Sequence, residues 1–142
     1  MSLEAFDTTG PANSNVELVR DIWAAIGEGD QQLVSKLLAE DIVWTIPEMP
    51  NVPFAGCWQG RQKVREFFDV IGAVQEVIEF APEEIVAEGS KVVVLGHFAN
   101  RIRKTGRISR SNWAQVWTVR NGQVVSMNEF VDTHAVISAF EP

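Results

Sequence analysis

An Asn121-Gly122 pair between two alternating runs constrains this chain more than any other feature. Asn-Gly is typical of a two-residue type I′ hairpin turn, because both central positions need positive φ. Counting outward from such a turn places Arg120 opposite Gln123 and fixes the register of both strands. Directly opposed residues share a face. One face of the hairpin is therefore predicted to be a pocket wall with aromatic and polar side chains and one carboxylate: Trp113, Gln115, Trp117, Asn128, Phe130 and Asp132.

The apolar spacing is helical in the first half of the chain and alternates in the second. Ser14 and Glu17 form a capping box, which predicts the start of a first helix, and Asp30 can cap a second. This order predicts an α+β fold, with about three helices on one face of a curved, mostly antiparallel sheet. We expect one domain over residues 14–142, after a flexible arm over residues 1–13. The predicted elements are helices in 14–26, 30–38 and 61–71, strands at 41–46, 76–87, 91–103, 107–120 and 123–132, a loop over 48–59, and a short helix after residue 132.

Composition excludes several classes of function. The formal charge of −7 argues against nucleic acid or an anionic membrane as the main partner, since both need a concentrated positive surface. No apolar run approaches the roughly 20 residues of a membrane helix, and the first residues do not have the pattern of a secretory signal. The single cysteine, Cys57, and the absence of any His/Cys/Asp/Glu spacing typical of a metal site predict no metal and no disulfide. We expect a cytoplasmic protein.

The Thr105-Gly106 turn extends the register to the preceding strand. A two- or four-residue loop would place Phe98 opposite Trp113, so that Phe98 and Asn100 join the pocket face, whereas a three-residue loop would turn them away. The opposite face is too apolar for water. We therefore predict that a second copy covers it in a homodimer. The residues of that face are Val93, Leu95, His97, Ala99, Ala114, Val116, Val125, Met127 and Val131.

Two stretches carry a family resemblance: Pro53–Arg61, which runs into a helix, and Trp117–Val124, which is followed by Phe130-Val131-Asp132. With these motifs in this order, the chain resembles the nuclear transport factor two-like superfamily over residues 14 to 138. Within it the chain resembles the SnoaL-like group, which includes polyketide cyclases and ketosteroid isomerase-like proteins. The resemblance implies a cone-shaped fold that encloses a cavity for a small hydrophobic molecule. It also implies that Asp132 occupies a position like that of the acid/base in SnoaL-like cyclases, which need no cofactor.

Departures from the family pattern narrow the expected chemistry. The chain has no tyrosine, the oxyanion donor of the family's steroid isomerases. Ile46 stands where their general-base aspartate lies. Phe98 and Asn100 stand where limonene epoxide hydrolase-like members carry an arginine and an aspartate. Neither of these two reactions is therefore expected.

The remaining candidates each have a second interpretation. Asp132 is either an acid/base, with a pKa raised by burial, or the N-cap of the tail helix. The amides of Gln115, Asn128 and Asn100 either donate to a substrate oxygen or satisfy one another. Large aromatic residues either stack on a flat ligand or belong to the core; these are Trp44, Phe98, Trp113, Trp117 and Phe130.

Three functions follow from these alternatives. The first is a cofactor-independent cyclase, isomerase or hydratase that acts on a hydrophobic carbonyl compound. The second is a non-catalytic binding protein for an apolar metabolite, and the third is a dimeric accessory subunit. Five basic residues, Arg101, Arg103, Lys104, Arg107 and Arg110, gather at one hairpin tip, where they either attract an anion or keep the hairpin end soluble.

Overall fold

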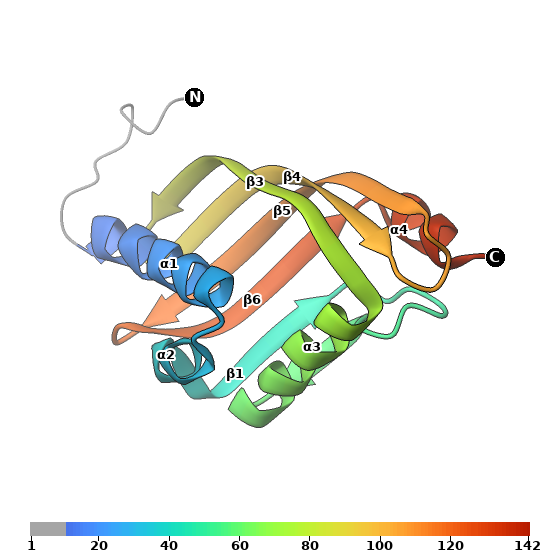
Figure 1. Cartoon of the computed structure of the whole chain (residues 1–142). Coiled ribbons are helices and arrows are strands. Elements are labelled where there is room, and N and C mark those ends of the chain that lie inside the picture. The colour runs from blue at the N-terminus through green and yellow to red at the C-terminus, as the bar shows by residue number, and fades with distance from the viewer. Residues whose placement is uncertain (1–10) are drawn as a thin grey trace.

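A computed structural model describes residues 11–142 and shows a curved six-stranded sheet with helices around it (Figure 1). The strand order is β2-β1-β6-β5-β4-β3. Only the β1–β6 pair is parallel; the other pairs are antiparallel. The predicted α+β class is therefore confirmed. The elements are α1 (Pro11–Glu28), α2 (Gln31–Leu37), β1 (Leu38–Ile46), β2 (Gly56–Gln59), α3 (Arg61–Val74), β3 (Gln75–Glu88), β4 (Lys91–Ile102), β5 (Ile108–Arg120), β6 (Gln123–Val131) and α4 (Thr133–Phe140).

The first helix begins earlier than predicted. It starts at Pro11, so Ser14 and Glu17 lie inside α1 and the predicted capping box is wrong. Proline is well tolerated at a first helical turn, where its missing N–H would have no partner. Of the predicted arm, residues 1–10 lie outside the described residues, and residues 11–13 belong to α1. The second cap is confirmed, because the Asp30 side chain accepts from the Leu33 backbone N–H at 3.1 Å.

The predicted loop over residues 48–59 ends in a short strand that the sequence analysis missed. Gly56 has φ 99°, and β2 pairs from there with β1 in an antiparallel hairpin. The strand is an edge strand of only four residues, too short to show a period-two pattern. Pro82 lies where a sheet tolerates proline: β3 is an edge strand, and its pairing with β4 shifts between Pro82 and Glu84.

The helices divide between two ends of the sheet. Figure 1 shows α1 and α2 at one end and α4 at the other, with α3 alongside β1. Asn15 on α1 donates to the carbonyl of Gly89 in the β3–β4 turn at 3.1 Å. The inward residues of α1, Val19 and Ile22, are fully buried. No described helix is long and apolar enough to cross a membrane.

A β-bulge in β6 changes the predicted hairpin. The turn itself is confirmed, since Arg120 pairs with Gln123 and Val119 with Val124. The register then shifts by one residue, because Thr118 pairs with Ser126 and leaves Val125 as the extra residue. A one-residue slip moves every later side chain to the other face. Beyond the bulge, the inward residues of β6 are therefore Met127, Glu129 and Val131, and the predicted inward position of Asn128, Phe130 and Asp132 is wrong.

The β4–β5 pair keeps the predicted face with a different register. Phe98 pairs with Ser111, and Gly96, not Phe98, lies opposite Trp113. This shift of two residues preserves the parity, so Phe98 and Asn100 are buried on the concave face as predicted, together with Val92 and Val94. The change arises because the Ile102 N–H donates to the Arg107 carbonyl, which centres the turn between Lys104 and Thr105, one residue before the predicted centre.

Candidate active site

A cavity of about 120 Å³ lies between the concave face of the sheet, the C-terminal end of α3 and α4. We call it the inner cavity. The loop after β1 closes one side of it with Met49 and Phe54. Phe54 also packs against Phe140 of α4, with ring centroids 5.9 Å apart. The polar residues that line the inner cavity are Gln75, Asn100, Ser109 and Glu129.

One carboxylate is held in this wall by a chain of hydrogen bonds. Val94, Gln115 and Glu129 form one cross-strand row. The Gln115 amide donates to Oε1 of Glu129 at 3.0 Å, and the Trp117 indole N–H donates to the Gln115 amide oxygen at 3.1 Å. The indole can only donate, so it directs the amide oxygen toward itself and the amide nitrogen toward the carboxylate.

The pKa of Glu129 is shifted by its surroundings. Burial raises the pKa of the carboxyl, because it disfavours the charged form, and the Gln115 hydrogen bond partly opposes this by lowering it. The net direction is upward. A carboxyl group with a raised pKa suits proton transfer near neutral pH better than an ordinary surface glutamate does.

A second polar row faces the same cavity. Asn100 pairs directly with Ser109, and both side chains are buried. The Ser109 hydroxyl has no hydrogen-bond partner among residues 11–142. A buried hydroxyl without a partner costs free energy, so this group is available for a ligand or a water molecule.

The edge strand β3 supplies an apolar rim to the inner cavity. Val77 and Phe80 line it, yet they remain 62% and 42% exposed. The Phe80 ring stacks on Trp113, with centroids 4.8 Å apart and planes 8° apart. Exposed large apolar side chains beside a cavity are typical of a ligand entrance.

The structure separates the predicted site residues into three groups. Phe98 and Asn100 line the inner cavity, and Gln115 supports it through Glu129. Trp44, Trp113 and Trp117 are buried on the same side; Trp44 and Trp117 pack edge to face at 5.5 Å in the core.

The third group lies away from the cavity. Asn128 and Phe130 are on the outer face, and Phe130 is 57% exposed. Asp132 is exposed, and its side chain accepts from the Ala135 backbone N–H at 3.2 Å as the N-cap of α4. The predicted capping interpretation is confirmed, and the predicted wall position of Asp132 is wrong because of the bulge.

Glu129 is the site residue that the sequence analysis missed. The sequence signal for it is weak: its neighbours at odd positions, Met127 and Val131, are apolar, whereas Asn128 and Asp132 occupy even positions. The structure supplies the missing observation, because Val124 and Met127 are both fully buried and a spacing of three between inward residues requires a bulge.

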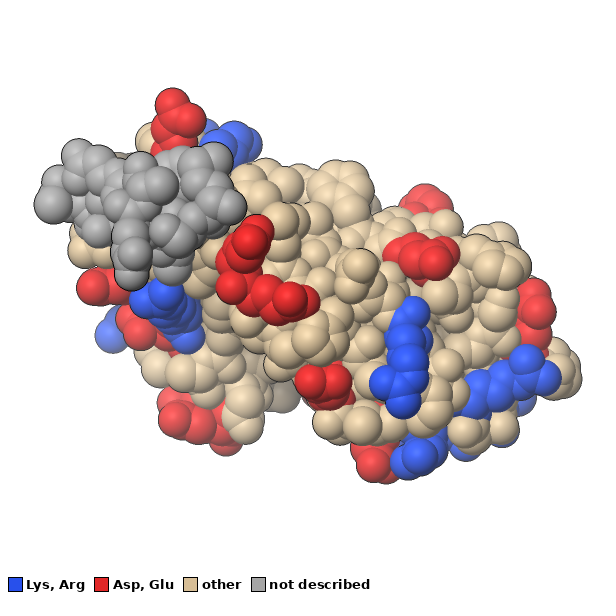
Figure 2. All heavy atoms as spheres, turned by 90° about the horizontal axis from the view of Figure 1, so that it is seen from above, with Lys and Arg blue, Asp and Glu red and all other residues tan. Residues whose placement is uncertain are grey.

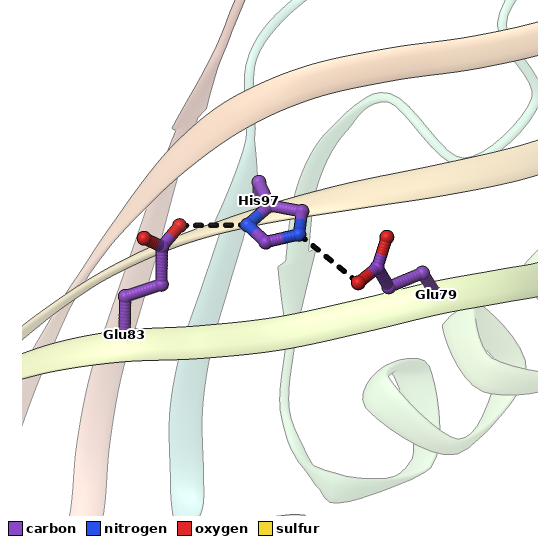
Figure 3. A network of polar contacts seen from close by, with 3 residues as sticks. All are labelled: Glu79, Glu83 and His97. Carbon is purple, nitrogen blue, oxygen red and sulfur yellow. Dashed lines mark hydrogen bonds and ion pairs between the residues drawn. The ribbon is translucent and has the colours of Figure 1, made fainter.

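A second titratable cluster lies on the outer face (Figure 3). His97 of β4 contacts two glutamates of β3, Glu83 at 2.7 Å and Glu79 at 3.2 Å. The hydrogen bond to Glu83, and then that to Glu79, raises the pKa of His97. The predicted position of His97 away from the pocket is confirmed. No group of three or more potential metal ligands is found among the described residues.

The basic residues of the β4–β5 connection have structural contacts. Arg103 donates to the Gly72 carbonyl through Nε and Nη2, and Arg107 donates to the Pro142 carbonyl. Figure 2 shows several basic residues at the right-hand end, where Figure 1 places this connection, with acidic residues beside them and residues of both charges elsewhere on the same face. These contacts attach α3 and the C-terminus to the connection. Arg103 and Arg107, two of the five basic residues, therefore have a structural role that needs no bound anion.

The fold and the inner cavity define the class of the protein: a small α+β protein of the nuclear transport factor two-like fold. A model of the SnoaL-like domain matches residues 19–127, and the chain belongs to this family. The chain is 34% identical to an NTF2-like protein from Burkholderia xenovorans, with a TM-score of 0.85, over 92% of this chain and 98% of that one.

More distant structures share the fold. An NTF2-like protein from Burkholderia thailandensis is 27% identical, with a TM-score of 0.80, over 90% of this chain and 98% of that chain. The protein TerC, co-crystallised with polyporic acid, is 24% identical over 91% of this chain and 99% of its own, with a TM-score of 0.78. No curated protein matches the chain.

Proposed function

We propose that the protein is a cofactor-independent enzyme that transfers a proton next to a carbonyl group of a small hydrophobic substrate, with Glu129 as the acid/base. The observation that carries this proposal is the Trp117–Gln115–Glu129 hydrogen-bond chain beside the inner cavity. Cyclisation and isomerisation of carbonyl compounds begin with such a transfer, and hydration of an enone ends with protonation of the same carbon. The chain of donors orients the carboxyl, and burial adjusts its pKa.

The oxyanion that forms when a proton leaves the carbon next to a carbonyl needs hydrogen-bond donors. The unpartnered Ser109 hydroxyl and the Asn100 amide lie in the same cavity wall as Glu129 and supply them. Ile46 also lines the cavity, so the first strand contributes no competing base.

The size of the inner cavity favours a substrate that is only partly enclosed. Its volume of about 120 Å³ is below the roughly 300 Å³ at which ligand pockets begin. The remainder of the molecule would rest on the exposed Val77 and Phe80 side chains. A co-crystallised small molecule in TerC is compatible with this use of the fold.

Deuterium exchange next to a carbonyl tests the reaction without knowledge of the natural substrate. A panel of cyclic ketones and enones in D₂O, followed by proton NMR, measures catalysed exchange directly. Glu129→Gln should abolish it, whereas Asp132→Asn, which changes an exposed cap, should retain it. Equal exchange by both variants and the wild type would exclude Glu129 as the base.

The alternative function, a binding protein for an apolar metabolite, rests on the exposed rim. It predicts ligands that co-purify in native mass spectrometry, no catalysed exchange, and unchanged binding in Glu129→Gln. The two functions are therefore separated by the same pair of variants.

We also propose a homodimer through the outer sheet face. Leu95, Ala114 and Phe130 form one cross-strand row on this face, and Leu95 and Phe130 are 40% and 57% exposed. An exposed apolar row of this kind is typical of an interface. Light scattering at micromolar concentration should give a dimeric mass for the wild type and a monomeric mass for Phe130→Glu. A monomeric wild type would refute the dimer.

A further inference from the structure

A second cavity, larger and separate from the carboxylate of the inner cavity, lies among α1, α2 and α3, and we call it the helix cavity. Its volume is about 290 Å³. The apolar part of its wall comes from all three helices and the start of β1. The apolar residues are Ile26, Val34, Leu38, Val64, Phe68 and Ile71.

Two arginines of α3 face the same cavity. Arg61 and Arg65 are one helical turn apart, so their side chains lie on one face of α3 together with Val64 and Phe68. Arg61 is half-buried, and its Nε donates to the Leu38 carbonyl at 2.9 Å. Arg65 donates from Nη2 to the Ser35 hydroxyl at 3.4 Å.

Neither guanidinium forms an ion pair with a carboxylate of residues 11–142. One acidic residue, Asp30, also lines the wall, and its carboxylate accepts from the Leu33 N–H at the N-terminus of α2 rather than from either arginine. The chain has a formal charge of −7, yet these two arginines beside an apolar cavity have no carboxylate partner among the described residues. Partial burial weakens the solvation of a guanidinium, so an anionic partner would stabilise it.

We infer that the helix cavity binds a small amphipathic carboxylic acid, with the carboxylate on Arg61 and Arg65 and the hydrocarbon part among the apolar side chains. The fork of N–H donors on a guanidinium matches a carboxylate better than any neutral group. A volume near 290 Å³ suits a medium-chain or monocyclic acid, at the lower end of known ligand pockets. This inference does not depend on the proposed function, because the two cavities share only the apolar Ile71 and none of the polar residues of the proton-transfer site.

A matched pair of ligands tests the role of the charge. Octanoate and 1-octanol have the same chain length and differ in the head group. Methyl NMR on protein labelled at isoleucine and valine follows Ile26 and Val34, which line this cavity and not the inner one. Octanoate should shift these two signals and bind about tenfold or more tightly than octanol. Equal affinity for the alcohol, or shifts confined to the inner cavity, would overturn the inference.

Variants on one helix separate the two arginines from a general charge effect. Arg61→Gln should weaken octanoate binding about tenfold and Arg65→Gln, which is exposed, about threefold, while octanol binding stays the same. Lys63→Gln is the control, because Lys63 pairs with Glu66 and lies outside the cavity wall.

Arg61 also anchors α3 to Leu38, so Arg61→Gln removes a structural contact that Arg65→Gln leaves intact. If Arg61→Gln is unfolded, the effect of Arg65→Gln and the salt dependence of octanoate affinity test the carboxylate site without it. Affinity that is unaffected by Arg65→Gln and by salt would refute the carboxylate site.

Discussion

Gly96 is the position at which a single methyl group should cost the most. It lies opposite Trp113, whose indole crosses the sheet over the glycine and stacks on Phe80. A Cβ added to Gly96 would overlap both this indole and the Ala81 carbonyl oxygen. The Cε2 atom of Trp113 would be only 2.8 Å away.

The expected cost follows from which of these atoms can move. Overpacking of a well-filled core costs roughly 1–3 kcal/mol. One of the two obstacles to Gly96→Ala is backbone of the paired strand, so the free energy of unfolding should fall by about 3 kcal/mol, the upper end of that range. For a chain of this length, that is a fall in Tm of roughly 10 °C.

Urea unfolding followed by tryptophan fluorescence measures the effect, and near-UV circular dichroism reports the indole environment. Gly72→Ala is the matched control: it makes the same change in α3, where a Cβ would meet no atom within 4 Å. That variant should gain about 0.5–1 kcal/mol, because alanine loses less backbone entropy than glycine in a helix. A loss below about 1 kcal/mol for Gly96→Ala would refute the packing argument.

Three further predictions concern charged groups. Asp132→Ala should lower the free energy of unfolding by about 1 kcal/mol through loss of the α4 cap, measured by urea unfolding, while ketone exchange is retained; loss of exchange would restore Asp132 as a catalytic candidate. The raised pKa of Glu129 means that its protonated form favours the folded state, so this contribution is present below the unfolded pKa and is lost as pH rises through the folded pKa. Glu129→Gln should therefore gain stability relative to the wild type as pH rises from 4 to 8, and a constant difference would contradict the shift. The pKa of His97 is raised by Glu83 and Glu79, so its contribution is full below the unfolded pKa and lost above the folded one; NMR titration should show the raised pKa in the wild type and a lower one in Glu83→Gln.

Much of the fold follows from local signals. The Asn121-Gly122 turn, the Asp30 cap and the helical spacing of α3 are each set by a few neighbouring residues, and each is found where predicted. The predicted concave position of Phe98 and Asn100 is correct although the predicted register is wrong by two residues, because a shift by an even number of residues keeps the face.

The site was less predictable, because it depends on one extra residue. Counting from a turn assumes an uninterrupted ladder, and Val125 breaks that assumption without a glycine or proline to mark it. Ordinary burial preferences would also have placed Phe130 inside and Glu129 outside, whereas the tertiary structure does the reverse. Pairing with Gln115 from β5 makes the half-buried carboxyl tolerable, and such a partner becomes visible only in three dimensions.

The bulge in β6 also means that the pairing of the residues between the Asn121-Gly122 turn and Glu129 decides which side chain faces the cavity. If Val125 were paired in an unbroken ladder instead, Asn128 and Phe130 would face the cavity in place of Glu129. Removal of Val125 deletes only the extra residue, so Gln115 would still pair with Glu129 and the carboxylate would stay in the wall. Insertion of one residue between Ser126 and Glu129, by contrast, would turn the carboxylate to the outer face and leave the cavity without its acid/base.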